Sequence, residues 1–300
     1  MADRLAKTEA MAKRHREEFQ AMEYILDQDG IHQPMTPVRH RDEEYEESGF
    51  ALLLAMQERH FWYRGRHRFL LRALDGHLAG TRTMPEAIDL GGGVGGWLRY
   101  LATRRPGRFG SLALADSSLL ALRMAGDVLP AGTERYRVDL MDLGWRERWD
   151  VAFLLDVIEH LPDDAGALRE AGRSLRPGGL LFVTAPAMPR FWSYNDEYAR
   201  HLRRYVRQDL AHLAEQAGLE LHDARYFMFL LSPLYWLSRH RPGIDALDER
   251  QRQELARRSH QVPAWPINEA LAAVFGAETP LGHRIRFPWG TSILGVFRKP

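Results

Sequence analysis

Short apolar runs alternate with helix-forming stretches from residue 85 to the end of the chain. The expected strands lie at 86–90, 110–116, 134–140, 149–156 and 180–186, the last after a turn RPGG, and then within 219–229 and at 291–299. The run at 149–156 is almost wholly apolar, as a central strand covered on both faces should be. This alternation predicts a doubly wound parallel sheet, which binds ligands at the carboxyl ends of its strands.

The residues outside this sheet are expected to be mainly helical. Residues 1 to 30 are rich in Ala, Glu, Lys, Arg and Met and predict a helix that ends near Gly30. An exposed linker, TPVRHRDEEYEE, follows, and a second helical stretch from Gly49 to His77 carries the aromatic sequence HFWYRGR. Another sixty or so residues separate the last two predicted strands, which is too many for a hairpin loop and predicts an inserted element.

The composition narrows the classes of function. The 300 residues are 45% hydrophobic, enough for one large α/β domain with additions or for two small domains. The formal net charge is +1, so a nucleic-acid partner is not favoured. There is no cysteine, which excludes disulfides, thiolate metal sites and a cysteine nucleophile. The charged N-terminus lacks a signal-peptide core and no run reaches the roughly 18 apolar residues of a membrane span, so we expect a cytoplasmic protein.

A glycine-rich turn, DLGGGVGG, lies where the first predicted strand passes into a helix. Gly91, Gly93 and Gly95 alternate after Asp89, and glycine permits positive φ and close approach of a ligand. Two acids follow, because Asp116 ends the second strand and Asp139 ends the third. A carboxylate in the first position accepts both hydroxyls of a ribose. Both NAD and S-adenosylmethionine contain adenosine, so these residues do not separate the two cofactors.

Taken together, four segments resemble the class I S-adenosylmethionine-dependent methyltransferases, whose order and spacing they share: AIDLGGGVGGWLRYL, LALADSSLLALRMA, WDVAFLLDVIEHL and LRPGGLLFVTAP. The resemblance implies a Rossmann-like seven-stranded sheet with the last strand antiparallel. It also implies a helical extension that closes over the cofactor (1–80), a core (81–228 and 289–300) and an inserted lid or acceptor-binding element (229–288). An NAD enzyme is the disfavoured rival, because RPGG and EHL have no role in one.

The same resemblance assigns cofactor contacts by position. Asp89 and Gly91 would approach the methionine moiety, Asp116 would hold the ribose hydroxyls, and Leu140 would flank the adenine. In HFWYRGR, Trp62 would cover the cofactor and Arg66 would pair with an anion, although a helix that packs its aromatic side chains on the core is an equal alternative. The expected S-adenosylmethionine-binding residues are Asp89, Gly91, Gly93, Gly95, Asp116, Ser117, Asp139, Leu140, Asp156, Trp62 and Arg66.

The stretch LLDVIEHL brings Asp156, Glu159 and His160 to the end of the fourth strand, where the transferred methyl group should lie. Methyl transfer is an in-line displacement that requires aligned reactants, and a hydroxyl acceptor must also lose a proton. One interpretation is that Asp156 passes the cofactor while Glu159 and His160 only begin the next segment. The other is a catalytic role for Glu159 with His160 or His201 as general base, because histidine titrates near neutral pH.

A divalent metal is a third, less favoured interpretation. The spacing acid-x-x-Glu-His resembles the metal motif of ubiquinone-pathway O-methyltransferases and of plant small-RNA 2′-O-methyltransferases. Asp156, Glu159, His160 and His201 are the candidate ligands, with Asp where those groups have Glu. Two carboxylates and two imidazoles would suit a transition metal better than Mg²⁺.

The acceptor is indicated by two features. The basic segment RHLRRYVR places Arg200, Arg203 and Arg204 after the fifth strand, as a solvated helix face or as a clamp for an anionic acceptor. Its sequence context, like that of HFWYRGR, resembles bacterial methyltransferases linked to glycan and lipid pathways. The insertion begins YFMFLLSPLYWLSRHRPG, which indicates a core helix or an apolar lid over a lipid-like or aromatic acceptor, with peripheral membrane contact as a further possibility.

These observations predict a methyltransferase that acts on a hydroxyl of a small or lipid- or glycan-linked molecule. The alternatives are an N- or C-methyltransferase of a secondary metabolite, and a binding protein with a degenerate methyltransferase fold.

Overall fold

The computed structural model describes residues 24–38, 49–81, 83–239, 247–248, 250–251, 254–255 and 261–300. Within these residues, nine strands form one sheet in the order β1-β2-β5-β4-β3-β6-β7-β9-β8. Strands β5, β4, β3, β6 and β7 are parallel, and β9 runs antiparallel between β7 and β8. The bounds are β1 (Tyr24–Leu26), β2 (His32–Pro34), β3 (Glu86–Leu90), β4 (Ser111–Asp116), β5 (Glu134–Arg137), β6 (Trp149–Leu155), β7 (Leu175–Pro186), β8 (Glu220–Phe227) and β9 (Ser292–Arg298). The predicted doubly wound sheet with a reversed last strand is confirmed.

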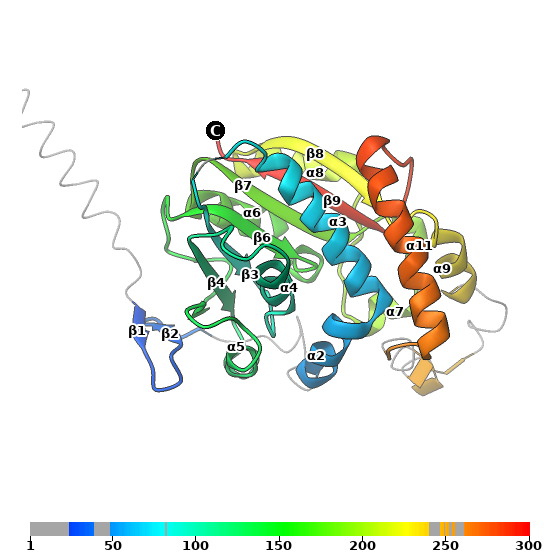
Figure 1. Ribbon diagram of the computed structural model, residues 1–300, viewed down its shortest axis with the longest axis horizontal. Coiled ribbons are helices and arrows are strands. Elements are labelled where there is room, and N and C mark those ends of the chain that lie inside the picture. The colour runs from blue at the N-terminus through cyan, green and yellow to red at the C-terminus, as the bar shows by residue number, and fades with distance from the viewer. Residues whose placement is uncertain are drawn as a thin grey trace, which may run out of the picture.

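Helices cover both faces of the sheet (Figure 1). They are α2 (Phe50–Arg59), α3 (Phe61–His77), α4 (Gly96–Arg104), α5 (Leu119–Gly126), α6 (Asp164–Ser174), α7 (Tyr194–Tyr198), α8 (Arg207–Ala217), α9 (Ser232–Arg239) and α11 (Trp265–Arg284), with short 3₁₀ turns η2 (Ile158–His160) and η3 (Pro189–Phe191). None of the described helices is both long enough and apolar enough to cross a bilayer.

Alternating residues of the strands supply two separate cores. Ile88 belongs to the core that packs against α6 and α8, whereas its neighbour Ala87 belongs to the core that packs against α3, α4 and α5. This follows from the period-two geometry of a strand, which directs successive side chains to opposite faces. Because both faces are buried, the central strands read as continuous apolar runs, and their register is fixed.

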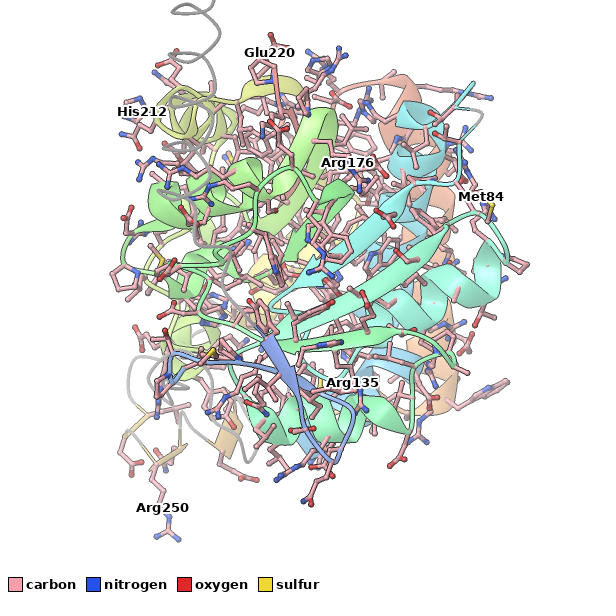
Figure 2. The ribbon with its side chains drawn as sticks, turned by 90° about the vertical axis from the view of Figure 1, so that its left-hand side faces the viewer. Met84, Arg135, Arg176, His212, Glu220 and Arg250 are labelled. Atoms are coloured by element: carbon pink, nitrogen blue, oxygen red, sulfur yellow. The ribbon has the colours of Figure 1, made fainter. Side chains whose placement is uncertain are left out.

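The first described segment corrects one prediction. Residues 24–34 form the hairpin β1–β2 rather than the end of a helix, and this hairpin raises the strand count from seven to nine. The Asp27 carboxylate accepts hydrogen bonds from the backbone of Asp29 and Ile31, both at 2.9 Å, and so fixes the turn. Tyr24 and His32 pack their rings on Tyr136 of β5. Figure 2 shows the hairpin in blue along that edge of the sheet, beside Arg135. Residues 1–23 and most of the expected linker lie outside the described residues.

Two further details differ from the expectation. The helical stretch 49–77 is two helices, because His60 adopts an extended conformation that ends α2, and its Nδ1 accepts a hydrogen bond from Trp62 N at 3.2 Å to cap α3. The RPGG sequence is not a separate turn but the bulged start of β7, where the pairing shifts register and Gly178 has a φ of 79°.

The N-terminal helices pack against the insertion. The Asn268 side chain of α11 bridges the break between α2 and α3, because its Oδ1 accepts from Phe61 N and its Nδ2 donates to Arg59 O, both at 2.9 Å. Gly65 of α3 allows close approach, since a Cβ there would lie 2.0 Å from the Phe275 ring of α11. Segments about two hundred residues apart in the chain therefore form one wall beside the carboxyl ends of the strands (Figure 1).

Candidate active site

A cavity of about 810 Å³ opens where β3, β4 and β6 end. The glycine loop, Asp116 and Asp156 form its inner side. Helices α2 and α3 contribute Phe50 and Trp62 to one wall, and α7 and α9 contribute Tyr194 and Tyr235 to another, among other residues. The position agrees with the general rule for ligand binding to doubly wound sheets.

The glycine loop needs its glycines for conformation and for space. Gly91, Gly93 and Gly95 have φ values of 71°, 57° and 78°, a region that disfavours residues with a Cβ. Gly91 N donates to Ala115 O at 2.7 Å, which ties the loop to the end of β4. A Cβ at Gly92 would lie 2.4 Å from the Asp89 carboxylate, so the middle one of the three consecutive glycines is a packing requirement as well.

Asp89 is buried beneath this loop. Its Oδ1 has no hydrogen-bond partner among the described residues. Burial raises the pKa of Asp89 to about 7, with Asp116 adding to the rise and Arg66 opposing it. A buried carboxyl with an unused oxygen at the edge of a cavity is suited to receive a donor group from a ligand.

The two acids expected at strand ends differ in place and surroundings, because Asp116 ends β4 whereas Asp139 lies two residues beyond the end of β5. Asp116 borders the cavity together with Ser117 and Leu140, and its carboxylate accepts from Gly93 N and Ser118 N, both at 2.9 Å. Asp139 does not border the cavity, and its Oδ1 accepts from Met141 N at 2.9 Å. Gly95 also lies behind the cavity wall, at the start of α4.

Asp156 and Arg66 form an ion pair at the cavity wall, with Arg66 buried and Asp156 partly exposed. Asp156 has a φ of 58°, and its backbone N–H donates to Thr184 O at 2.8 Å, so β7 fixes its position. The Arg66 guanidinium also lies over the rings of Trp62 and Tyr63, with Cζ 5.1 Å from each centroid. The anion that Arg66 pairs with in this structure is therefore a residue of the chain itself.

Glu159, His160 and His201 come together at the other side of Asp156. The 3₁₀ turn η2 begins the next segment here, so the backbone agrees with the first interpretation of LLDVIEHL, but the side chains line the cavity. Glu159 is fully buried, and neither carboxylate oxygen has a hydrogen-bond partner among the described residues. Burial, and next the charge of Asp156, raise the pKa of Glu159 well above its usual value. His201 Nε2 lies 4.0 Å from Glu159 Oε1, and the two imidazole rings meet edge to face.

Asp196 holds His201 from the opposite side. The distance from His201 Nδ1 to Asp196 Oδ1 is 2.9 Å. Arg204 donates to both oxygens of the same carboxylate, at 2.7 and 3.0 Å, and Ser193 N donates to Oδ2 at 2.9 Å. Burial of Asp196 disfavours its charge, but the hydrogen bonds from His201 and Arg204 and the charge of Arg204 leave its pKa below the ordinary value.

Arg204 connects this pair to two other segments. Its Nη1 donates to Ala187 O after β7 at 3.0 Å, and its Nη2 donates to the Tyr235 hydroxyl of α9 at 3.1 Å. The three predicted arginines thus differ. Arg200 and Arg204 border the cavity, whereas Arg203 pairs with Asp164 at 2.8 Å and with Pro162 O. Since Arg204 is already bound to Asp196, it orients this wall rather than offering an unused anion clamp.

Three of the four candidate metal ligands form one group. One ligand atom from each of Glu159, His160 and His201 lies within 4.8 Å of the others. Asp156 is not part of this group and faces Arg66 instead. One carboxylate and two imidazoles are a donor set that transition metals accept.

Helices α7 and α9 contribute side chains that were not among the predicted site residues. Asp196, Tyr194, Tyr235 and Arg239 all border the cavity, and Arg239 Nη1 donates to the Tyr194 hydroxyl at 2.9 Å. The spacing of Asp196 five residues before His201 was a usable signal for that pair. Tyr235 and Arg239 carried none, because α9 packs there only through tertiary contacts.

Known proteins match this chain in sequence. A family model described as a methyltransferase domain matches residues 53–224, more than half of the chain. The ubiquinone biosynthesis O-methyltransferase of Neisseria meningitidis serogroup A is 26% identical over 183 residues, which are 55% of this chain and 75% of that protein. The trans-aconitate 2-methyltransferase of Azoarcus sp. is 34% identical over 147 residues, 49% of this chain and 55% of that protein.

Solved structures match the fold. One is phosphoethanolamine N-methyltransferase 2 of Haemonchus contortus, with a TM-score of 0.55 and 17% identity, over 90% of this chain and 62% of that one. Another is a complex of the Haloferax volcanii Trm112 methyltransferase activator with a methyltransferase, with a TM-score of 0.54 and 17% identity, over 87% and 97% of the two chains. At these identities the likeness bears on the fold alone.

Proposed function

The chain belongs to the methyltransferase domain family and uses S-adenosylmethionine, and from this premise we propose that it methylates a hydroxyl group. The observation that carries the proposal is His201, whose ring borders the cavity while Asp196 holds its Nδ1. A hydroxyl must lose its proton during transfer, and an imidazole accepts a proton near neutral pH. The similarity to ubiquinone biosynthesis O-methyltransferases supports an oxygen acceptor.

We place the cofactor along the glycine loop. Asp89 offers a buried, unused oxygen for the amino end, and Asp116 offers a carboxylate at the position suited to ribose hydroxyls. Leu140 and Ser117 flank that position, and Asp156 and Arg66 lie at the methionine end under Trp62. S-adenosylmethionine supplies an activated methyl group on its sulfonium. Gly95 and Asp139 contribute through the loop and the backbone, because neither borders the cavity.

The proposed proton path uses three side chains. The His201 Nε2 atom takes the proton of the acceptor hydroxyl, and Asp196 stabilises the imidazolium that forms. Burial and the charge of Asp156 raise the pKa of Glu159 and so favour its protonated form, which can donate a hydrogen bond to the acceptor oxygen. The aromatic side chains around the cavity exclude water and align the hydroxyl for in-line attack.

We further propose that the acceptor is a small molecule or part of a lipid or glycan, and that the protein works at the periphery of a membrane when the acceptor is lipid-linked. Arg200 and Arg239 border the cavity and would favour an acceptor that carries a negative charge, a role expected from the sequence for Arg203 rather than Arg239. The apolar and aromatic parts of the cavity wall, including Phe50, Leu53 and Met56, would hold its hydrophobic portion.

The test is a product analysis with phenols, prenylated phenols and sugars as candidate acceptors. We expect formation of S-adenosylhomocysteine together with an O-methylated product identified by mass spectrometry. Asp196→Asn should slow this transfer while calorimetry finds unchanged S-adenosylmethionine affinity. An N- or C-methylated product, or full activity of Asp196→Asn, would contradict the proposal.

A further inference from the structure

The outward face of α11 is apolar for most of its length. Its exposed apolar positions begin at Trp265 and then recur every three or four residues, at Ile267, Ala270, Val274, Ala277 and Leu281. Trp265 is 79% exposed, and Ile285 continues the face beyond the helix. Twenty helical residues span about 30 Å. Large contiguous apolar patches of this kind mark interaction surfaces on folded proteins.

Helix α9 adds a second apolar face. Leu234, Trp236 and Leu237 are exposed there, and Leu230 precedes them. In Figure 1 both α9 and α11 lie at the end of the molecule opposite the hairpin β1–β2. Leu230 N donates to Glu278 of α11 at 2.9 Å, so the segment that leads into α9 is joined to α11.

The charges of these two helices are distributed unequally. Helix α9 has no carboxylate, and both carboxylates of α11 are engaged, Glu269 by Arg64 and Glu278 by Leu230 N. Two exposed arginines, Arg284 and Arg286, lie at and just beyond the end of α11, and Arg286 also pairs with Asp223 at 3.4 Å. An apolar surface with tryptophans and flanking arginines matches the boundary of a bilayer, where tryptophan rings lie among headgroups and arginine meets anionic lipid.

The same surface adjoins the cavity. Helix α9 directs Tyr235 and Arg239 to the cavity and leaves Leu234 and Leu237 on the outside. Pro263, just before α11, also borders the cavity. An amphiphilic molecule in a bilayer could therefore present its polar end to the cavity while its apolar chain stays in the lipid.

We propose that the outward faces of α9 and α11 bind the surface of an anionic lipid bilayer and bring the cavity to lipid-linked acceptors. The part of this inference that concerns lipid-linked acceptors rests on the proposed function, whereas the measurement of bilayer binding does not. A second copy of the chain is the alternative partner for such an apolar helix face. The flanking arginines favour the bilayer, because anionic headgroups complement their charge, whereas α9 and α11 of a second copy offer no carboxylate that is not already engaged.

The test is sedimentation of the full chain with vesicles of phosphatidylcholine, with and without phosphatidylglycerol. We expect binding to the anionic vesicles that weakens with salt, and about tenfold weaker binding for each of Trp265→Ser and Leu281→Asn. Leu120→Asn on α5 is the matched control, since Leu120 and Leu281 are 41% and 42% exposed on helices, and it should bind like the wild type.

Three outcomes would overturn the inference: no vesicle binding, equal loss in Leu281→Asn and Leu120→Asn, or a dimer in light scattering that Leu281→Asn dissociates. Vesicle binding is measured without an acceptor. Its failure therefore leaves O-methylation of water-soluble phenols intact, whereas failure of O-methylation leaves the vesicle result unchanged.

Discussion

The side of the cavity around Asp89 and Asp116 is made largely by backbone groups of one short loop, whereas the side around His201 is made by side chains from separate segments. In the first, the glycine conformations and the amides of Gly93 and Ser118 define the shape. In the second, Asp196, His201 and Arg204 depend on one another and on Tyr235. A general cofactor can be recognised by a backbone motif, while acceptor chemistry requires a particular set of side chains.

The largest expected effect comes from breaking the buried pair of the second side. Arg204→Met should lower the free energy of unfolding by about 3–5 kcal/mol, because it leaves the Asp196 carboxylate buried without its cation. Arg203→Met is the matched control, since the Arg203–Asp164 pair is partly exposed, and it should cost about 1 kcal/mol or less. Urea denaturation of both variants gives the comparison, and equal losses would refute the unequal roles of the two arginines.

Next in size is a test within the cofactor side. Asp116→Ala should weaken S-adenosylmethionine binding by about 10- to 100-fold, the loss expected for hydrogen bonds to a charged group. Asp139→Ala should change the affinity by no more than about threefold, because Asp139 does not border the cavity. Calorimetry measures both. A similar loss in the two variants would restore the direct cofactor role that the sequence alone assigned to Asp139.

The wall that α3 and α11 form beside the cavity can be tested at a pair of glycines in α3. Gly65→Ala should destabilise the fold by about 1–3 kcal/mol, because the added methyl group meets Phe275 of α11. Gly76→Ala on the same helix meets no atom within 4 Å and should stabilise it by about 0.5–1 kcal/mol. Thermal unfolding separates the two, and a loss in both variants would mean that the α3–α11 contact is not the cause.

A further comparison concerns the opposite pKa shifts of two buried acids. Folded Asp89 binds its proton more tightly than the unfolded chain, so its contribution to stability falls as pH rises from about 4 to about 7. As pH rises through that window, the wild type should therefore lose stability relative to Asp89→Asn by up to about 1.4 kcal/mol per pH unit. The pKa of Asp196 is lowered, so Asp196→Asn should show the reverse sign, the wild type losing its advantage as pH falls below about 4. Matching signs would contradict the assignment.

The difference between a local backbone motif and contacts among distant side chains also determines how much the sequence could predict. The alternation of strands and helices, the glycine loop and the position of Asp116 at a strand end follow from local periodicity and spacing, and these agree with the structure. The hairpin at 24–34 was missed because its rings pack on Tyr136, a contact that local composition does not reveal. Likewise, the Arg66–Asp156 pair joins residues ninety positions apart, and it changes the surroundings of Asp156 from those expected of a metal ligand.

The domain boundaries predicted from the sequence stay a prediction, although the contacts of α11 with α2 and α3 bear on them. Asn268 and Glu269 of the insertion bind Arg59, Phe61 and Arg64 of the extension. The extension and the insertion therefore pack against each other in one wall. The sequence of either segment alone could not predict this wall, because its contacts join side chains that lie far apart in the chain.

The central claim is that His201 removes the proton of a hydroxyl acceptor. The most direct measurement is the rate of O-methylation by His201→Ala with and without added imidazole, at equal saturation with S-adenosylmethionine. We expect a loss of about 10²- to 10⁴-fold that imidazole partly restores, because the small base replaces the missing ring. A wild-type rate in His201→Ala without imidazole would contradict the claim.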